Sequence, residues 1–280
     1  RVAVFPKIAC GKCPKCQSGL SHMCQNYNYI GSRRDGAFAD YLTAPATNLL
    51  PLPENVGFEE AAMLEPFAVA ANAVRNGTDG INPDEAKIAV CGLGTIGTML
   101  VMLLEAAGCR NIYLVGNKES QKKRLTEIGI DGEHFCSSND DNLAEKLMEI
   151  SNGGIDLYFE CVGKNESINY GIDASAPGGR IILVGNPHSD MHFAKDTYWK
   201  ILRRQLKLSG IWNSTFSQNV ADDLDGRIDD WNYVLEKIGN GKLTPKNLIS
   251  HRLSIEELER GLIFMRDKSE NYCKVMMTEN

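Results

Sequence analysis

Residues 87–108 constrain the fold of this 280-residue chain more than any other stretch, because they place a glycine-rich turn between two apolar elements. Lys87–Cys91 is short, apolar and contains β-branched residues, which predicts a strand that is buried on both faces. The apolar residues 95–107 predict a helix. The turn between them has the pattern Gly-x-Gly-x-x-Gly, and this order of strand, turn and helix is typical of a dinucleotide site. A glycine-rich turn in another kind of α/β protein is the alternative.

The three glycines of this turn have separate tasks in such a site. Gly92 permits the tight turn, Gly94 lets the backbone approach a pyrophosphate, and Gly97 lets the helix pack closely on the strand. The helix begins at Thr95 and Ile96, and its free N–H groups and dipole favour an anion there. We therefore assign these five residues to a cofactor site.

The segment that follows alternates between strand and helix signals. The expected strands cover residues 111–115, 134–136, 155–159, 180–184 and 207–211, and the expected helices cover residues 119–128, 141–150 and 165–176. Alternation of this kind predicts an α/β fold with a parallel, doubly wound sheet, whose ligands bind at the carboxyl ends of the strands.

The end of the second expected strand bears on the choice of cofactor. Folds specific for NAD place Asp or Glu about 20 residues after the first glycine, where it binds the ribose hydroxyls. Here the strand leads into Gly116, Asn117 and Lys118. Glycine leaves room for the 2′-phosphate of NADP, and a lysine can bind that phosphate. We therefore predict NADP(H), with NAD(H) as the alternative because Glu119 could turn toward the ribose.

Charge and cysteine content narrow the class of protein. The net charge of −6 disfavours general binding to nucleic acid or to an anionic membrane. No apolar run approaches the roughly 18 residues that a membrane span requires. Four of the nine cysteines lie within 15 residues, which indicates metal binding in a reducing compartment, and we expect a cytoplasmic protein. Because the chain starts with Arg1, in what looks like the middle of a strand, we also expect a fragment.

The clustered cysteines have the spacing of a metal site. They follow the pattern C-x2-C-x2-C-x7-C, formed by Cys10, Cys13, Cys16 and Cys24. Four thiolates at this spacing can surround one zinc ion, and because such a shell is closed the site is expected to be structural. Lys12 and Lys15 lie between the cysteines and would offset the negative charge of the site. Four unrelated free cysteines and an iron–sulfur cluster are the alternatives.

This cysteine spacing, followed by an apolar glycine-rich segment and a nucleotide-binding pattern, resembles the zinc-dependent medium-chain alcohol and polyol dehydrogenases over essentially the whole chain. The resemblance implies a Rossmann-like domain and part of a GroES-like β-barrel with a structural zinc lobe. It also implies a second, catalytic zinc in the full-length protein, and a homodimer or homotetramer. The Cys and His-Glu ligands of that second zinc belong to the part of the barrel that precedes these residues, so we expect none here.

The same resemblance implies a cofactor-binding role for two loops that follow later strands of the expected sheet. Val162 and Val184 each lie beside a glycine at the end of an expected strand. In the family such loops hold the nicotinamide amide through backbone groups, which implies that both residues belong to the cofactor site. Ordinary turn chemistry is compatible with the same pattern.

Glu65 is the candidate catalytic residue. Residues 58–64 predict a short helix, and residues 66–76 predict a second one with Pro66 in its first position. A carboxylate at this apolar junction is costly unless it is paired or bound to metal. Glu65-Pro66 is similar to the Glu-Pro of polyol dehydrogenases, which implies that Glu65 is a ligand or near-ligand of the catalytic zinc. The alternative is a carboxylate that the helix dipole stabilises.

Two adjacent arginines are candidates for substrate binding. Arg33 and Arg34 lie in the glycine-bounded loop IGSRRDGAFADY, and guanidinium groups bind phosphate bidentately. An equally weighted alternative is a solvated loop in which they pair with Asp35 or Asp40. The loop closely resembles that of family members that oxidise a phosphorylated hexitol, which implies contact with the phosphate of a substrate.

These features predict three segments. Residues 1–70 form part of the GroES-like catalytic domain, residues 71–212 form the Rossmann-like domain, and residues 213–280 return to the catalytic domain. In the last segment we expect helices over residues 227–238 and 255–265, a capping box from Ser254 to Glu257, and a closing strand over residues 272–277.

The predicted function is zinc-dependent hydride transfer between a small-molecule polyol or sugar phosphate and NAD(P). The main alternative is a non-catalytic cofactor-binding fragment or regulator, because the ligands of the catalytic zinc are not in this sequence. A zinc-ribbon protein that binds nucleic acid is disfavoured by the net charge of −6.

Overall fold

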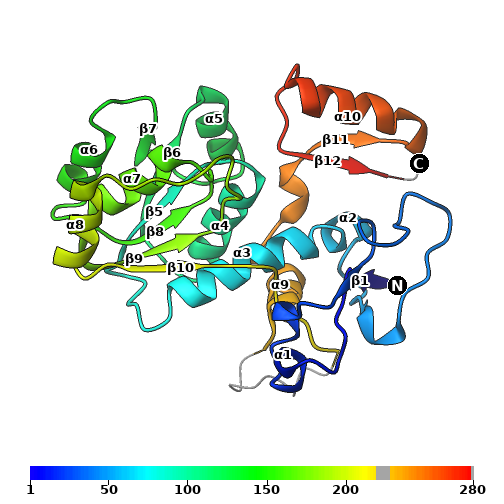
Figure 1. The fold of residues 1–280 in the computed structure, drawn as a ribbon. Coiled ribbons are helices and arrows are strands. Elements are labelled where there is room, and N and C mark those ends of the chain that lie inside the picture. The colour runs from blue at the N-terminus through cyan, green and yellow to red at the C-terminus, as the bar shows by residue number, and fades with distance from the viewer. Residues whose placement is uncertain (219–227, 279–280) are drawn as a thin grey trace. The chain divides into compact units, whose positions relative to one another are not determined.

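The computed structural model describes residues 1–218 and 228–278. The chain divides into two compact units, one formed by residues 1–72 and 212–280 and the other by residues 73–211 (Figure 1). In the part of the chain that the structure describes, none of the helices has the length and hydropathy needed to cross a bilayer.

The unit of residues 73–211 is built on a six-stranded parallel sheet. Its strand order is β10-β9-β8-β5-β6-β7. The strands are β5 (Lys87–Cys91), β6 (Asn111–Gly116), β7 (Phe135–Ser137), β8 (Ile155–Glu160), β9 (Ser175–Leu183) and β10 (Lys207–Gly210). The chain moves outward from β5 to β6 and β7, and then returns to β8 on the other side of β5. The strand order therefore reverses between β5 and β8, which is where doubly wound sheets bind ligands.

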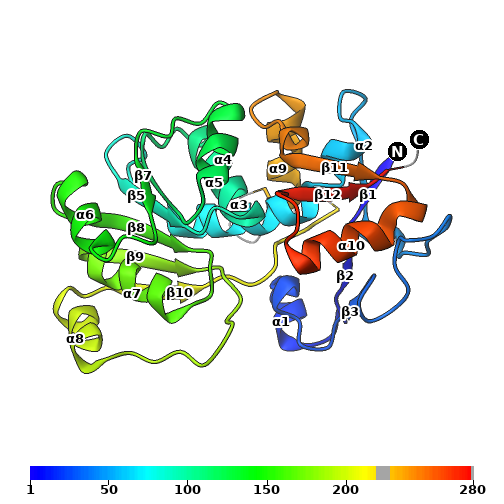
Figure 2. The same ribbon diagram turned by 90° about the horizontal axis from the view of Figure 1, so that it is seen from above.

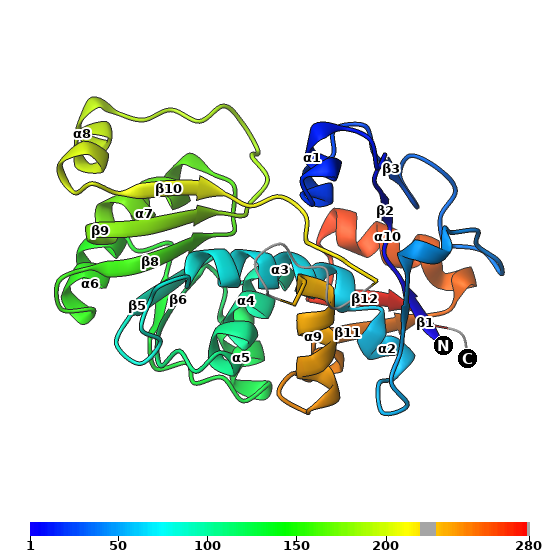
Figure 3. The same ribbon diagram turned by 90° about the horizontal axis from the view of Figure 1, so that it is seen from below.

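Helices cover both faces of this sheet. They are α4 (Thr95–Ala106), α5 (Glu119–Glu127), α6 (Leu143–Ile150), α7 (Asn165–Ala174) and α8 (Lys195–Arg203). Figures 2 and 3 show α6 and α7 on one face and α4 on the other. The strand β5 is closed off from solvent between these layers, since Ile88, Ala89 and Val90 are fully buried. The predicted doubly wound sheet is confirmed.

The boundaries of two neighbouring predicted elements, α7 and β9, were wrong. Strand β9 begins at Ser175, five residues before the expected start, and α7 ends at Ala174 instead of residue 176. Ser175 pairs with Ile155 of β8 before a register shift interrupts the ladder. The pairing with β8 therefore starts at Ser175, inside the segment for which the sequence predicted a helix.

The other unit contains short ribbons and helices. Its strands are β1 (Val2–Val4) paired with β4 (Leu49–Pro51), β2 (Lys7–Ile8) paired with β3 (Asn28–Tyr29), and β11 (Ile249–Leu253) paired with β12 (Lys274–Met277). Its helices are α1 (Pro14–Gln17), η1 (Ser21–Met23), η2 (Ala46–Asn48), α2 (Phe58–Ala61), α9 (Asp230–Gly239), η3 (Pro245–Leu248), η4 (Ile255–Glu257) and α10 (Leu258–Asp267). The first two ribbons are antiparallel and the third is parallel.

The helix that carries Glu65 differs from the prediction. Helix α3 (Leu64–Gly77) begins before Pro66, so the proline is its third residue and Glu65 lies inside its first turn. The first N–H groups of a helix have no intrahelical partner, and a proline is therefore tolerated throughout the first turn. The preceding helix α2 is correspondingly shorter than expected and ends at Ala61.

The C-terminal elements follow the prediction in part. The capping box is confirmed, because the Ser254 amide donates to Glu257 Oε2 at 3.2 Å. The helix expected over residues 255–265 begins as the 3-10 turn η4 and continues as α10. Helix α9 begins at Asp230, and the expected start at residue 227 lies outside the described residues. Strand β11 had no prediction, since five residues that alternate weakly gave no clear signal.

Candidate cofactor pocket and metal centre

A cavity of about 270 Å³ lies at the carboxyl ends of β5, β6 and β8, where the strand order reverses. Its lining is formed by Cys91, Gly92, Leu93, Gly94, Val115, Gly116, Asn117, Gln121, Ser138, Cys161 and Val162. The glycine-rich turn therefore borders a cavity in the position that ligands of doubly wound sheets occupy.

The three glycines have the distinct geometries that their predicted tasks require. Gly92 has a φ of +99°, which a tight turn needs and glycine adopts without strain, and its amide donates to Val115 O of the neighbouring strand β6 at 2.9 Å. A Cβ on Gly97 would lie 1.9 Å from Gly92 O, so no larger residue lets α4 approach β5 this closely. Gly94, the N-cap of α4, has no atom within 4 Å of an added Cβ. Its backbone is open, and it leads into Thr95 and Ile96 in the first turn of the helix.

The loop after β6 is fastened by a side chain that the sequence analysis missed. Gln121 Oε1 accepts from the amides of Asn117 at 2.9 Å and Lys118 at 3.2 Å. Its place three residues after the N-cap of α5 is the capping-box position, and this signal could have revealed it. Asn117 lines the cavity, whereas Lys118 does not.

No Asp or Glu is among the described residues that line this cavity. Ser138, which does line it, was also missed by the sequence analysis. Its amide donates to Gly116 O at 2.7 Å, a contact that depends on the pairing of β6 with β7 and gives no local signal. The cavity wall at the end of β6 is therefore neutral.

A buried carboxylate holds the loop after β8. Glu160 is 1% exposed, and its Oε1 accepts from the amides of Val162 and Gly163, each at 2.8 Å, and from Ser167 Oγ at 2.7 Å. Val162 lines the cavity. Val184 does not line it, but its amide donates to Glu160 O at 2.8 Å. The two loops predicted to hold a nicotinamide amide thus meet at one residue.

The two cysteines in the cavity wall are protected thiols. Burial raises the pKa of Cys91 to about 12, and burial together with the Glu160 carboxylate raises the pKa of Cys161 well above its ordinary value. Both sulfurs therefore remain protonated at neutral pH and lack the nucleophilic thiolate.

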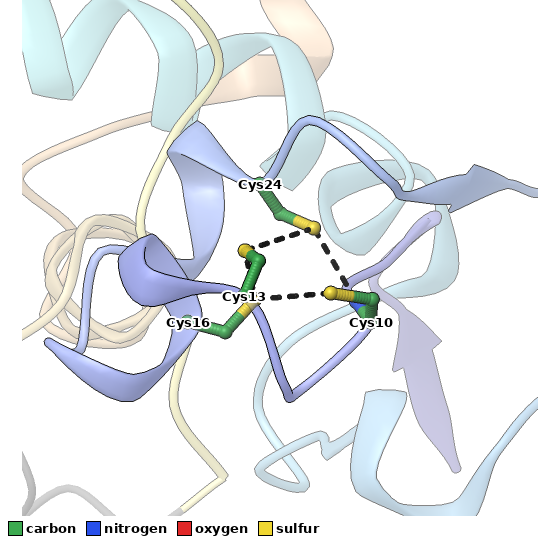
Figure 4. A group of neighbouring side chains, drawn as sticks. All are labelled: Cys10, Cys13, Cys16 and Cys24. Atoms are coloured by element: carbon green, nitrogen blue, oxygen red, sulfur yellow. Dashed lines mark hydrogen bonds between the residues drawn. The ribbon is translucent and has the colours of Figure 1, made fainter.

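The four cysteines of the N-terminal motif converge on one point (Figure 4). Their Sγ atoms all lie within 4.8 Å of one another. The separations are 3.5 Å for Cys13 and Cys16, 3.9 Å for Cys13 and Cys24, and 4.0 Å for Cys10 and Cys16. A zinc tetrahedron with Zn–S bonds of about 2.3 Å has edges of about 3.8 Å. The residues therefore fit a single zinc ion, and the spacing leaves no room for an iron–sulfur cluster, in which the thiolates bind different irons.

Backbone amides support these ligands. Hydrogen bonds from the N–H groups of Lys12 and Cys13 lower the pKa of the Cys10 thiol to about 6. A metal ligand of this type has to be deprotonated, and amide donors to the sulfur favour that form. We define the segment of residues 10–24, which contains α1, η1 and the four ligands, as the cysteine lobe.

The charge-offsetting role of the lysines between the ligands stays a prediction. Lys12 and Lys15 are exposed, so solvent and salt screen their charges from the thiolates. The buried cation near the cysteine lobe is Lys7 of strand β2, which is 3% exposed and lies outside the cysteine motif.

The two candidate arginines contact different partners. Arg33 donates from Nη1 to Tyr27 O at 2.9 Å, and its Cζ lies 3.8 Å from the centroid of the Tyr27 ring. Arg34 donates to Thr43 Oγ1 at 3.3 Å. Within the described loop, neither arginine forms an ion pair with Asp35 or Asp40, so the acidic partners of the alternative interpretation are not used.

Glu65 is paired with a tyrosine. Tyr29 Oη donates to Glu65 Oε1 at 2.9 Å, and burial together with this carboxylate raises the pKa of Tyr29. The partners are 36 residues apart, and the sequence analysis missed Tyr29. Among the described residues, the four cysteines are the only group of three or more His, Cys, Asp or Glu side chains able to hold a metal ion. Glu65 is thus not joined by further ligands in this part of the chain.

Two family models match this chain. Residues 1–54 match the family model described as alcohol dehydrogenase GroES-like domain, and residues 95–227 match the model described as zinc-binding dehydrogenase. The chain belongs to the zinc-dependent medium-chain dehydrogenases, and the predicted resemblance is confirmed.

Curated relatives of the chain are dehydrogenases with different substrates. Galactitol 1-phosphate 5-dehydrogenase of Escherichia coli (strain K12) is 28% identical over 274 residues, which cover 96% of this chain and 74% of the relative. L-idonate 5-dehydrogenase of Vitis vinifera is 28% identical over 281 residues, which cover 99% of this chain and 72% of the relative. The relatives are oxidoreductases, and their names do not agree on one substrate.

Solved structures share the fold. A short chain alcohol dehydrogenase from Escherichia coli CFT073, in complex with NADH, matches with a TM-score of 0.84 and 22% identity over 100% of this chain and 77% of the other. A putative zinc-binding dehydrogenase from Sinorhizobium meliloti 1021, bound to NADP, matches with a TM-score of 0.79 and 23% identity over 99% and 75%. The same fold therefore accepts either cofactor.

Proposed function

We propose that this chain carries out zinc-dependent hydride transfer between a polyol or polyol phosphate, of which galactitol 1-phosphate is the leading candidate, and NADP(H). The observation that carries the proposal is the cavity at the reversal of strand order, which the glycine-rich turn borders and no described acidic side chain lines. Membership of the zinc-dependent dehydrogenases supports the reaction class.

The cofactor roles follow from this cavity. The open backbone at Gly94 and the first turn of α4, with Thr95 and Ile96, would receive the pyrophosphate. Asn117 and the neighbouring Lys118 would receive the 2′-phosphate beside Gly116. Their amides are already oriented by Gln121, so the loop is ordered before a ligand binds. In the same proposal, the backbone at Val162 and Val184 holds the nicotinamide amide, in loops that Glu160 fastens.

Two metal roles belong to the proposal. Zinc bound to Cys10, Cys13, Cys16 and Cys24 would hold the cysteine lobe together, and its closed shell leaves no position for substrate. Glu65 is proposed as a ligand or near-ligand of a catalytic zinc, and Tyr29 would orient its carboxylate through the 2.9 Å hydrogen bond. A zinc ion at such a site supplies Lewis acidity toward the substrate hydroxyl.

The substrate assignment is supported by the arginine loop. Arg33 and Arg34 are exposed, and neither uses an acidic partner from its own loop. A phosphate group is the natural counter-ion for guanidinium groups of this kind. The relative named galactitol 1-phosphate 5-dehydrogenase favours a phosphorylated hexitol, whereas the L-idonate relative favours an unphosphorylated substrate. Three further points belong to the proposal. The protein is proposed to be cytoplasmic and to form a homodimer or homotetramer. Residues 71–212 are proposed as its dinucleotide-binding domain.

The test begins with cofactor affinity. NADPH and NADH are titrated into the wild type, Lys118→Ala and Lys123→Ala, with nicotinamide fluorescence as the signal. Lys123 lies on the same helix, pairs with Glu127 at 3.7 Å and is the control for the loss of one charge. We expect NADPH to bind more tightly than NADH, and Lys118→Ala to weaken NADPH alone by about tenfold. NADH preference in all three proteins would contradict the NADP assignment.

Substrate is then tested with the zinc-loaded full-length protein, because the Cys and His-Glu ligands of the catalytic zinc are expected outside these residues. Oxidation of galactitol 1-phosphate, galactitol and L-idonate is followed by the absorbance of reduced cofactor, in the wild type and in Arg34→Ala. Turnover of the phosphorylated hexitol that Arg34→Ala weakens would support the proposal. Cofactor binding without turnover of any polyol would favour the second candidate, a non-catalytic cofactor-binding protein, which the absence of further described ligands beside Glu65 supports.

A further inference from the structure

Lys7 is a buried cation without an acidic partner in its immediate contacts. It is 3% exposed, and its ammonium group donates to the backbone oxygen of His22. Lys7 Nζ lies 4.3 Å from the centroid of the Tyr27 ring. With the Asn213 amide turned to satisfy its neighbours, the Asn213 side-chain oxygen accepts from Lys7 Nζ at 3.3 Å and from Trp212 Nε1 at 2.8 Å. All of these partners are neutral.

A buried ammonium group surrounded by neutral partners is costly, because it has lost the solvation of water without gaining a counter-charge. The dipoles of a carbonyl, an amide and an aromatic ring replace only part of that solvation. A source of negative charge nearby would offset this cost and keep the ammonium form of Lys7.

The cysteine lobe supplies that charge. His22 lies in η1, two residues before the ligand Cys24, so the hydrogen bond from Lys7 holds the chain directly beside the metal site. Cys24 is itself 2% exposed, and its Sγ accepts from the Cys10 amide at 3.4 Å. Burial lowers the pKa of Lys7, while the thiolates of Cys24 and Cys16 act in the opposite direction. Lys7 lies in strand β2, outside the cysteine lobe, but close enough to the ligands for their charge to act on it.

Four thiolates around one Zn²⁺ carry an excess of two negative charges, which the lobe has to balance. The exposed Lys12 and Lys15 balance this negative charge only weakly, since salt and water screen a surface charge. A cation that is excluded from solvent is screened far less, and Lys7 has this position.

We propose that Lys7 is the counter-cation of the tetrathiolate metal centre, and that its buried charge retains the metal in the cysteine lobe. The inference rests on the structural zinc site of the proposed function. It assigns Lys7 a positioning role, since the residue touches the chain beside a ligand and not the metal itself.

The test measures metal release independently of dehydrogenase activity. Zinc-loaded wild type, Lys7→Met and Lys7→Gln are mixed with excess chelator, and the rate of zinc release is followed with a chromogenic zinc indicator. Gln can still donate to the His22 oxygen, so this variant removes the charge but keeps a donor. The matched controls are Lys12→Met and Lys15→Met, which remove the same charge from exposed positions of the same lobe.

We expect release from both Lys7 variants to be about tenfold faster than from the wild type, as for other groups that support metal ligands. The two controls should stay within about twofold of the wild type. Release from Lys7→Gln at the rate of the controls would overturn the inference. A wild type that binds no zinc would overturn the metal centre as well, whereas one zinc per chain with unaltered Lys7 variants would overturn the role of Lys7 alone.

A measurement on the wild type tests the inference even if the Lys7 variants do not fold. Because a buried charge is little screened, the rate of zinc release from the wild type should depend only weakly on salt concentration. A steep increase with salt would show that exposed cations balance the site and would overturn the inference. Unchanged NADPH affinity of the Lys7 variants would show that residues 73–211 remain folded in them.

Discussion

The cofactor cavity and the cysteine lobe are two sites built by opposite means. The cavity is shaped by backbone: its turn depends on glycines, and the strand that leads into it has fully buried Ile88, Ala89 and Val90. The lobe is shaped by side chains: its helix α1 has no buried residue, and the strands β2 and β3 that flank the lobe have only two residues each.

The difference shows which interactions each site needs in order to exist. Apolar burial around β5 stabilises the cavity whether or not a ligand is present. Helices α1 and η1 of the cysteine lobe bury no residue, so we expect the free energy of metal binding to take the place of a core there. One site should therefore be sensitive to packing and the other to chelation.

The largest effect is expected for Gly97→Ala, which disrupts the packing of α4 on β5 beside the cofactor cavity. The added Cβ would lie 1.9 Å from the Gly92 carbonyl oxygen, and α4 would have to move away from β5. We expect a loss of about 3 kcal/mol or more in the free energy of unfolding, measured with urea, and loss of NADPH binding.

Gly94→Ala is the matched control on the same turn. Its Cβ would meet no atom within 4 Å, so the free energy of unfolding should stay within about 0.5 kcal/mol of the wild type. NADPH affinity should nevertheless fall by about tenfold, because the methyl group occupies the approach of the pyrophosphate. Equal destabilisation by both variants would refute the assignment of separate tasks to these glycines.

Removal of zinc should have the next largest effect, and it should be confined to the lobe. After chelation, we expect the backbone amides of residues 10–24 to exchange hydrogen freely, while those of residues 87–116 keep their protection. Hydrogen exchange with mass spectrometry measures both regions in one experiment. Loss of protection in β5 and β6 on chelation would mean that the metal also supports the sheet.

The smallest effect is expected for Tyr29→Phe, which removes one hydrogen bond from Glu65. Hydrogen bonds to a carboxylate contribute about 1.5 to 3 kcal/mol, and water can replace part of this at a half-buried site. We expect turnover to fall severalfold with unchanged zinc content and NADPH affinity. Tyr27→Phe removes the same hydroxyl from a neighbouring ring that packs against Lys7 and Arg33, and it should leave turnover unchanged. Equal losses in both variants would contradict the role of Tyr29.

Features that depend on neighbours in sequence could be predicted from the sequence alone. The strand Lys87–Cys91, the glycine turn and the cysteine cluster are each defined within a few residues. Local patterns also give helix and strand periods, which explains why the succession of strands and helices along residues 87–211 was predicted with errors mainly at their ends.

Apart from Gln121, which accepts from amides three and four residues away, the contacts that were missed join residues far apart in the chain. Tyr29 reaches Glu65 only because of the placement of β3 and α3, and Ser138 reaches the cavity only through the pairing of β7 with β6. Lys7 lies three residues before the first cysteine, and nothing local distinguishes it from the exposed Lys12 and Lys15. Burial, which decides the role of each lysine, is a property of the folded chain.

The short span of the cysteine lobe has a consequence for the order of folding. The contact from Cys10 to Cys24 closes a separation of 14 residues, whereas the hydrogen bond from Lys87 to Asp156, beside the pairing of β5 with β8, spans 69. Loop closure costs more entropy as the loop grows, and contacts between distant residues form slowly. A lobe closed by so short a span can therefore form around its metal during synthesis, before the sheet has all of its strands.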